Sequence, residues 1–130
     1  DLKLRFHRNA TDIGKGIEEL ISIIREASRE KHPEGREAEI LLISPPYIGE
    51  NMETSVFAES FGGRRAVEIS RELPSVYRKI ADEYSVYYLD ASKIAQVSFI
   101  DSLHFDAAGH GKMAKAVYRK ICQIYANSCI

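Results

Sequence analysis

The chain has 130 residues, of which 45% are hydrophobic and 28% charged, so it can bury an apolar core, and this composition argues against wholesale disorder. This length fits one domain better than two, and we expect residues 1–130 to form one. The 18 Lys and Arg residues are interleaved with the 19 Asp and Glu residues, which argues against nucleic acid as a major partner. No apolar run approaches the roughly 20 residues that cross a bilayer, so we expect no membrane span.

The two cysteines, Cys122 and Cys129, lie near the end of the sequence without a metal-type C-x-x-C pairing. This usage predicts neither a disulfide framework nor a zinc site, and it favours a reducing, cytoplasmic compartment. We expect Cys122 to be a buried free thiol.

The first predicted helix begins near Thr11 and Asp12, whose side chains are typical of a helix start. Apolar residues then recur at spacings of three and four, which places them on one helical face. These residues are Ile13, Ile17, Leu20, Ile21, Ile24 and Ala27. The helix should end near residues 32–35, where Pro33 and Gly35 are breakers.

An unbroken apolar run follows at residues 39–44 (EILLIS) and is closed by Pro45 and Pro46. The run is too short for a helix, so it predicts a strand covered on both faces. Residues 45–62 then form a long irregular connection, and loops of this length inside compact domains are often functional.

Helical spacing returns at residues 64–84, but Pro74 lacks a backbone donor and predicts a bend near Leu73 or a division of the helix. Residues 85–89 (SVYYL) predict a second short buried strand. A last helix is expected from about Ala107 to Tyr125, with Asp106 capping its start. Its inward face is expected to carry Met113, Val117, Ile121 and Ile124.

The order helix, strand, helix, strand, helix is typical of a parallel sheet with covering helices. Two strands make a poor sheet, because stable sheets usually have about four to six strands and open edges invite association. We therefore expect further strands from an N-terminal segment outside this chain, which starts at Asp1 without an initiator Met. A homo-oligomer is a second expected way to cover the open edges.

Residues 100–110 carry the strongest chemical signal, because they follow the last strand, where catalytic groups collect in open α/β folds. Asp101 and His104 are three apart, so one turn of loop can bring the carboxylate to one imidazole nitrogen while the other points outward. Such a pair is the acid and base portion of a nucleophilic triad. The alternative is a surface loop in which the aspartate caps a turn and the histidine is solvated.

Other polar residues at this edge of the sheet have simpler explanations than chemistry. His110 could join His104, Asp101 and Asp106 around a metal, but packing or capping in the first turn of the last helix explains it better, so we expect no metal. Asp90 could be a second catalytic carboxylate, although turn capping is the better explanation.

Aromatic side chains on the long connection are candidates for a substrate pocket. Tyr47, Phe57 and Phe61 lie beyond the carboxyl end of a strand and could line an acyl or aryl pocket. Ordinary loop packing is an equally good explanation of the same residues.

Several segments together resemble one known family. Residues 101–110 (DSLHFDAAGH) resemble the C-terminal block of the SGNH, or GDSL, hydrolases, which are serine esterases and lipases. Residues 43–47 (ISPPY) look like a strand-end segment of the arylesterase-like branch of that family, and residues 88–91 (YLDA) resemble its last strand. Residues 1–6 (DLKLRF) look like the continuation of the family's G-x-N-D block, with Asp1 as its final letter.

This resemblance implies the C-terminal part of a three-layer α/β/α fold with a parallel sheet. It implies a Ser-His-Asp triad in which His104 is the general base, Asp101 orients it, and no cofactor is needed. The G-D-S-L block with the nucleophilic serine is absent from the sequence, as are the family's asparagine and glycine oxyanion donors. The serine is therefore expected on an N-terminal segment of the same protein, and the isolated chain is expected to be inactive.

The predicted function is hydrolysis of a small ester, with Tyr47 and Phe57 as substrate-binding residues. The resemblance leaves open carboxylesterase, acetylesterase, thioesterase and acyltransferase activity. The alternative is a noncatalytic α/β interaction module, or an inactive fragment, with the same fold.

Overall fold

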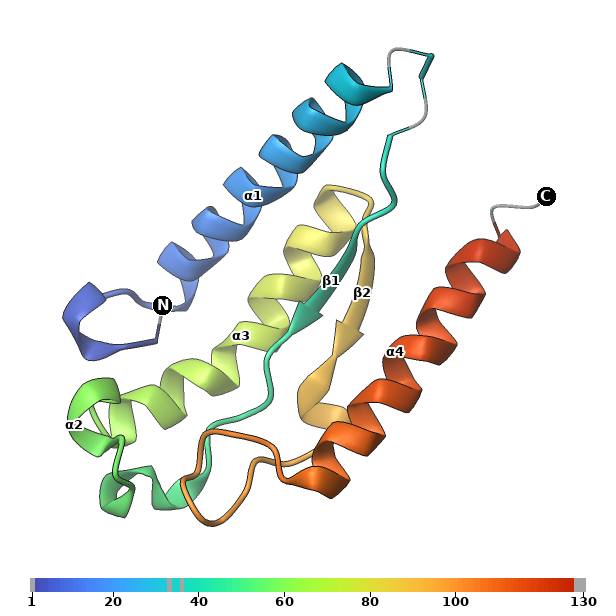
Figure 1. Cartoon of the computed structure of the whole chain (residues 1–130). Coiled ribbons are helices and arrows are strands. Elements are labelled where there is room, and N and C mark those ends of the chain that lie inside the picture. The colour runs from blue at the N-terminus through green and yellow to red at the C-terminus, as the bar shows by residue number, and fades with distance from the viewer. Residues whose placement is uncertain (1, 33, 36, 128–130) are drawn as a thin grey trace.

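The computed structural model describes residues 2–32, 34–35 and 37–127, and its long elements follow the order predicted from the sequence (Figure 1). Three long helices alternate with two strands among these residues. The short elements between them are η1 (Leu4–Phe6), η2 (Glu50–Thr54), α2 (Ala58–Phe61) and η3 (Ala91–Lys93).

Helix α1 (Ala10–Lys31) begins slightly earlier than predicted, because Asn9 caps it. The Asn9 side-chain oxygen accepts a hydrogen bond from the Asp12 amide at 2.9 Å. The Asp12 carboxylate in turn accepts one from the Asn9 amide at 3.4 Å. This capping box satisfies two backbone N–H groups at the helix start.

The sheet consists of β1 (Leu41–Ser44) and β2 (Tyr87–Asp90), which pair in parallel with Leu41 opposite Tyr87 and Ser44 opposite Asp90. The prediction of strands buried on both faces is wrong for the described residues. Only Ser44 is buried, and the other strand residues are half-buried. The reason is that each strand here has one paired edge and one open edge, so part of each strand stays accessible.

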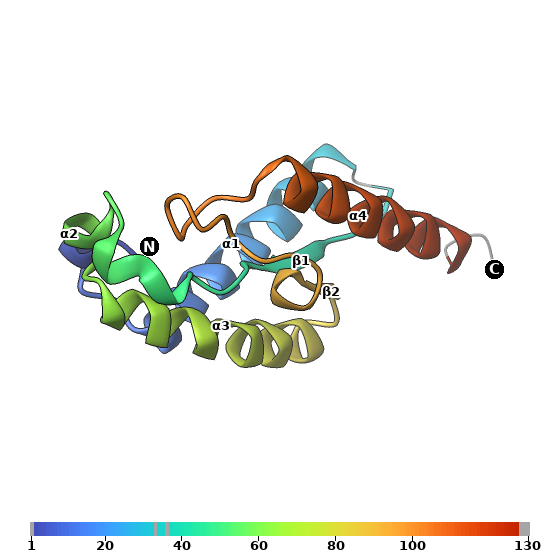
Figure 2. The same cartoon turned by 90° about the horizontal axis from the view of Figure 1, so that it is seen from below.

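Helices cover the two faces of this sheet. Helix α3 (Arg64–Glu83) lies on one face and α4 (Ala107–Asn127) on the other, and α1 packs beside α3 (Figure 2). Buried side chains of α1 and α3 form the main core cluster, against which Leu42 and Tyr88 of the strands pack. The members of that cluster are Ala10, Ile13, Ile69, Leu73 and Tyr77.

Pro74 does not divide α3, which is continuous from Arg64 to Glu83. Leu73 and Tyr77 flank the proline and are both buried, at 1% and 8% exposure. Their burial outweighs the single backbone hydrogen bond that a proline removes, since most helix stability in proteins comes from packing of an apolar face.

The predicted apolar faces of α1 and α4 are only partly buried. Ile13, Ile21 and Ile124 are buried, but Leu20 is 55%, Ile24 43% and Ile121 41% exposed. Ala27 is also exposed, and Ile17, Met113 and Val117 are half-buried. Helical spacing predicts which residues share a face, whereas burial also requires a neighbouring element to cover that face.

Two further expectations need correction. Residues 45–62 are not irregular throughout, because they contain η2 and α2. Helix α2 ends at Phe61 and is capped by Gly62, whose φ of 79° suits a glycine. Cys122 is a free thiol but exposed, and Cys129 lies outside the described residues.

Within the described ranges, no helix combines the length and the apolar character needed to cross a membrane.

Candidate active site

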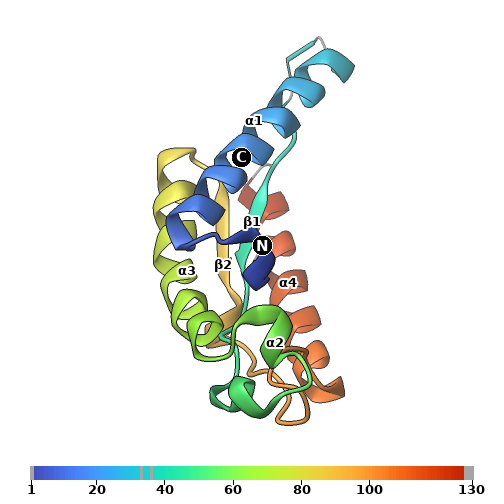
Figure 3. The same cartoon turned by 90° about the vertical axis from the view of Figure 1, so that its left-hand side faces the viewer.

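Two segments meet beyond the carboxyl ends of the strands. One is the connection from β1 to α3, with η2 and α2, and the other is the loop between η3 and α4 (Figures 1 and 3). This edge of a parallel sheet is where functional groups of α/β folds gather.

Asp101 and His104 form a hydrogen-bonded pair within this loop. The His104 Nδ1 atom lies 2.7 Å from Asp101 Oδ2. Asp101 Oδ1 accepts hydrogen bonds from the backbone amides of Leu103 at 2.9 Å and His104 at 3.0 Å. One aspartate therefore closes the turn with one oxygen and binds the imidazole with the other.

These contacts also set the charge of Asp101. The His104 amide, then the Leu103 amide and the His104 side chain, lower the pKa of the Asp101 carboxyl from 3.8 to about 2. The carboxylate is therefore ionised at neutral pH and favours the imidazole tautomer that carries its proton on Nδ1.

The other edge of the imidazole is accessible. The His104 side chain is 63% exposed, while that of Asp101 is 20% exposed. No serine hydroxyl in the part of the chain that the structure describes hydrogen-bonds to His104, and Ser102, which lies between the pair, is buried at 3% exposure. The arrangement leaves Nε2 of this imidazole able to accept a proton from a group that approaches it.

Phe57 joins this pair, whereas Tyr47 does not. The Phe57 ring lies edge-on to the His104 imidazole, with 5.6 Å between ring centroids, and Phe61 packs edge-on behind Phe57 at 6.3 Å. Tyr47 is 43% exposed and lines a cavity of about 440 Å³ whose lining includes Ser102 but neither Asp101 nor His104. The structure thus brings three of the four predicted site residues together, and their roles remain predictions.

Asp90 and His110 have structural partners. The Asp90 carboxylate accepts hydrogen bonds from the Ser92 amide at 3.0 Å and the Ser92 hydroxyl at 2.6 Å, so it caps η3 as turn chemistry predicts. The His110 ring lies edge-on to Phe105. Asp106 Oδ1 accepts a hydrogen bond from the Gly109 amide at 2.7 Å, which confirms the predicted cap of α4.

Among the residues described, no group of three or more His, Cys, Asp or Glu side chains is arranged to hold a metal ion.

Sequence reasoning missed two residues that contact the Asp101 turn. The Ser55 hydroxyl donates to the Asp101 carbonyl oxygen at 2.6 Å, and the Gly49 amide donates to the Ser102 carbonyl oxygen at 2.8 Å. Each pair is distant in sequence, so no local pattern joins them. The only available signal was their place in the long connection that was expected to be functional.

Comparisons with known proteins find similar structures, whereas no family model and no curated protein sequence matches the chain. A carbohydrate acetylesterase from Sinorhizobium meliloti has a TM-score of 0.85 and 25% identity, with 95% of this chain and 56% of that chain covered. The aryl esterase of M. smegmatis has a TM-score of 0.84 and 24% identity, with the same coverage. A carbohydrate acetylesterase family member from S. meliloti has a TM-score of 0.74 and 35% identity, covering 84% of this chain and 49% of that chain.

These similarities define the fold of the chain. It is a partial α/β fold of the SGNH type found in esterase structures, with helices on both faces of a small parallel sheet, which confirms the predicted fold class. The chain spans about half the length of each of these structures.

Proposed function

We propose that this chain carries the acid and base half of a serine ester hydrolase, with His104 as general base and Asp101 as its orienting carboxylate. The observation that carries the proposal is the 2.7 Å contact between Asp101 Oδ2 and His104 Nδ1 on an imidazole that is otherwise exposed. The esterases among the similar structures support the same class of reaction.

In the proposed reaction, His104 Nε2 takes the proton from a serine hydroxyl as the serine oxygen attacks the ester carbonyl carbon. The resulting imidazolium carries protons on both nitrogens, and the ionised Asp101 beside Nδ1 stabilises it. The imidazolium then gives its Nε2 proton to the departing alcohol, which leaves an acyl-serine. Water hydrolyses this ester when His104 takes a proton from the water and returns one to the serine oxygen.

We propose that the serine comes from a segment outside this chain that adds strands to the sheet. Two observations support such a partner. Strand β1 pairs on one edge only among the described residues, and apolar side chains of α1 and α4, including Leu20 and Ile121, are exposed. An added strand would supply hydrogen-bond partners to the open edge, and the elements that follow it would cover apolar surface.

The substrate we propose is a small acetyl or aryl ester. The similar structures are of carbohydrate acetylesterases and an aryl esterase, and an aryl acetate probes both kinds of ester at once. Phe57 is proposed to contact the substrate beside His104, because its ring lies against the imidazole. Tyr47 is proposed to contact a more distant part of the substrate from the neighbouring cavity.

The decisive experiment compares the assembled protein with its His104→Ala variant. Ester hydrolysis of an aryl acetate and labelling by a fluorophosphonate should both occur in the parent protein. Turnover and serine labelling should fall by a factor of at least about 10³ in the variant, because the serine loses its base. Unchanged turnover in the variant would contradict the assignment.

The matched control is His110→Ala, which removes an exposed imidazole that packs on Phe105 outside the pair. It should leave turnover within about twofold of the parent, since surface changes away from the reacting groups have small effects. Mass spectrometry of the fluorophosphonate-labelled peptide would identify the serine and show whether it lies outside this chain. A labelled serine within residues 1–130 would overturn the proposed partner.

A further inference from the structure

The Ser55 hydroxyl lies at the junction of the two groups that contact His104. It donates a hydrogen bond to the Asp101 carbonyl oxygen at 2.6 Å and accepts one from the Phe57 amide at 3.2 Å. Asp101 holds the imidazole at Nδ1, and Phe57 lies edge-on to the same ring. One oxygen atom therefore links the main chains of the two residues whose side chains contact the imidazole.

The hydrogen bonds inside the Asp101 turn cannot do this by themselves. They join only residues 101–104, so they fix the shape of the turn but not its placement on the fold. Placement requires contacts to other elements. Three such contacts come from the β1–α3 connection: the Ser55 hydroxyl on Asp101, the Gly49 amide on Ser102, and the cluster around Met52 on which Leu103 packs.

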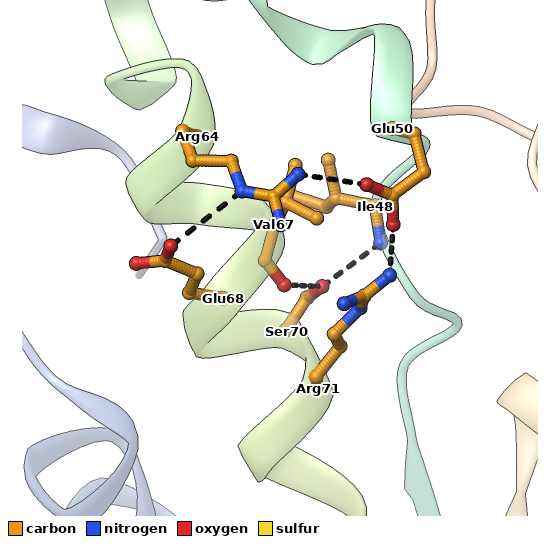
Figure 4. A network of polar contacts seen from close by, with 7 residues as sticks. All are labelled: Ile48, Glu50, Arg64, Val67, Glu68, Ser70 and Arg71. Atoms are coloured by element: carbon orange, nitrogen blue, oxygen red, sulfur yellow. Dashed lines mark hydrogen bonds and ion pairs between the residues drawn. The ribbon is translucent and has the colours of Figure 1, made fainter.

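The connection that makes these contacts is itself anchored to α3. The Glu50 carboxylate pairs with both Arg64 and Arg71 of α3, and the Ser70 hydroxyl accepts the Ile48 amide at 3.0 Å (Figure 4). Met52, which lies between Glu50 and Ser55, is fully buried against α3 residues. Ser55 thus extends from a segment held by packing, by an ion-pair network and by a backbone hydrogen bond.

We infer that Ser55 is a positioning residue of the active site, which aims the His104 imidazole by holding Asp101 and Phe57 through one hydroxyl group. The inference rests on the proposed function, because the aim of an imidazole matters when its free nitrogen must meet a serine. Ser55 does not touch the reacting atoms. Its effect passes through the Asp101 main chain and the Phe57 ring.

The expected effect is on turnover and not on substrate affinity. A displacement of about 1 Å between reacting groups can lower a rate about 100-fold. In Ser55→Ala, the turn keeps its internal hydrogen bonds and its contacts with Gly49 and the Met52 cluster, but Asp101 loses its hydrogen bond to the β1–α3 connection. We therefore expect kcat for an aryl acetate to fall roughly 10- to 100-fold while KM changes by less than about threefold.

The conservative and control variants separate positioning from general destabilisation. Ser55 has φ of −71° and ψ of 153°, which threonine adopts readily, so Ser55→Thr retains the hydroxyl and should recover kcat to within about threefold. Ser75→Ala makes the same substitution on α3 and removes the 2.8 Å hydrogen bond that the Ser75 hydroxyl donates to the Glu72 carbonyl oxygen. It should leave kcat unchanged. Equal losses in Ser55→Ala and Ser75→Ala, or no recovery in Ser55→Thr, would overturn the inference.

Gly49→Ala is a second variant that should displace the Asp101 turn, through its contact with Ser102. An alanine Cβ at position 49 would lie 2.8 Å from Ser102 Cβ and 3.1 Å from Ser102 Cα, so the turn must shift. Gly49 has φ of −66° and ψ of 145°, which alanine adopts without strain, so this contact is the cause of any change. Gly49→Ala should lower kcat as Ser55→Ala does, whereas Gly111→Ala, which meets nothing within 4 Å, should not.

A measurement of the contact between the Phe57 and His104 rings tests the positioning role of Ser55 independently of esterase activity. In protein labelled at Phe and His, the nuclear Overhauser effect between the Phe57 and His104 rings should be present in the parent and weakened in Ser55→Ala. If the parent hydrolyses the ester and Ser55→Ala matches it in kcat and in this ring contact, the positioning role is wrong and the esterase proposal stands. If the parent shows no hydrolysis, the esterase proposal fails, and the ring contact by itself decides whether Ser55 positions the imidazole.

Discussion

Replacing Asp101 by asparagine separates the two tasks of this carboxylate. The amide oxygen of asparagine can still accept the Leu103 and His104 amides, which now lie 2.9 and 3.0 Å from Oδ1. The amide nitrogen then faces Nδ1 of His104 where Oδ2 now lies at 2.7 Å. Because that nitrogen only donates, Nδ1 must become the acceptor and the imidazole proton must move to Nε2.

This change of tautomer sets the size of the effect. Two of the three hydrogen bonds to the side chain persist, so the turn should keep its shape and the protein its fold. An imidazole protonated on Nε2 cannot take the proton of a serine, and the same exchange in a Ser-His-Asp triad lowers kcat about 10⁴-fold. We expect a loss of that order in Asp101→Asn with an aryl acetate as substrate.

The assay combines steady-state hydrolysis with ¹⁵N resonances of the histidine ring, which report which nitrogen carries the proton. Asp106→Asn is the matched control, because asparagine replaces aspartate well at a helix N-cap, and its kcat should stay within about twofold of the parent. An Asp101→Asn variant that keeps more than about a tenth of the parent kcat, or a proton that stays on Nδ1, would refute the reasoning.

Three further predictions concern stability, measured by urea denaturation of the assembled protein. Because hydrogen bonds lower the pKa of the Asp101 carboxyl from 3.8 to about 2, its contribution to stability is complete above pH 3.8 and is lost as the pH falls through about 2. The stability of the parent should therefore converge on that of Asp101→Asn over this interval, and a constant gap would contradict the assignment. Gly14→Ala would place a Cβ atom 2.7 Å from Val76 Cγ1 and should lower the free energy of unfolding by about 1–3 kcal/mol. Gly16→Ala meets nothing within 4 Å and should raise it by about 0.5–1 kcal/mol. Equal effects of the two substitutions would show that α1 and α3 are not tightly packed at Gly14. Leu73→Ala removes a core side chain that is 1% exposed and should cost about 2–5 kcal/mol, and a cost below 1 kcal/mol would place Leu73 outside the core.

The features that could be predicted from the sequence depend on residues close together in the chain. Helical spacing located the three long helices, and the Asp106 cap of α4 acts over three positions. The hydrogen-bonded Asp101–His104 pair also spans three positions, so a short turn suffices to form it. The Asn9 cap of α1 also acts over three positions, but the prediction was based on Thr11 and Asp12 and placed the helix start one residue too late.

Other properties were decided only by how the elements pack. The exposure of Leu20 and Ile121 depends on which elements cover α1 and α4, and helical spacing is the same for covered and uncovered faces. Tyr47 and Phe57 share one connection, yet the fold places Phe57 against His104 and Tyr47 in a separate cavity.

The sequence by itself determined the parts of this protein that single turns of backbone can build: the helices, the short strands and the aspartate–histidine pair. Tertiary structure decided which residues from distant parts of the sequence contact that pair. Ser55 meets Asp101 across 46 positions of sequence, and it does so because η2 is held on α3 by packing and ion pairs. A contact of that span depends on the packing of several elements at once, which no local spacing of residue types encodes.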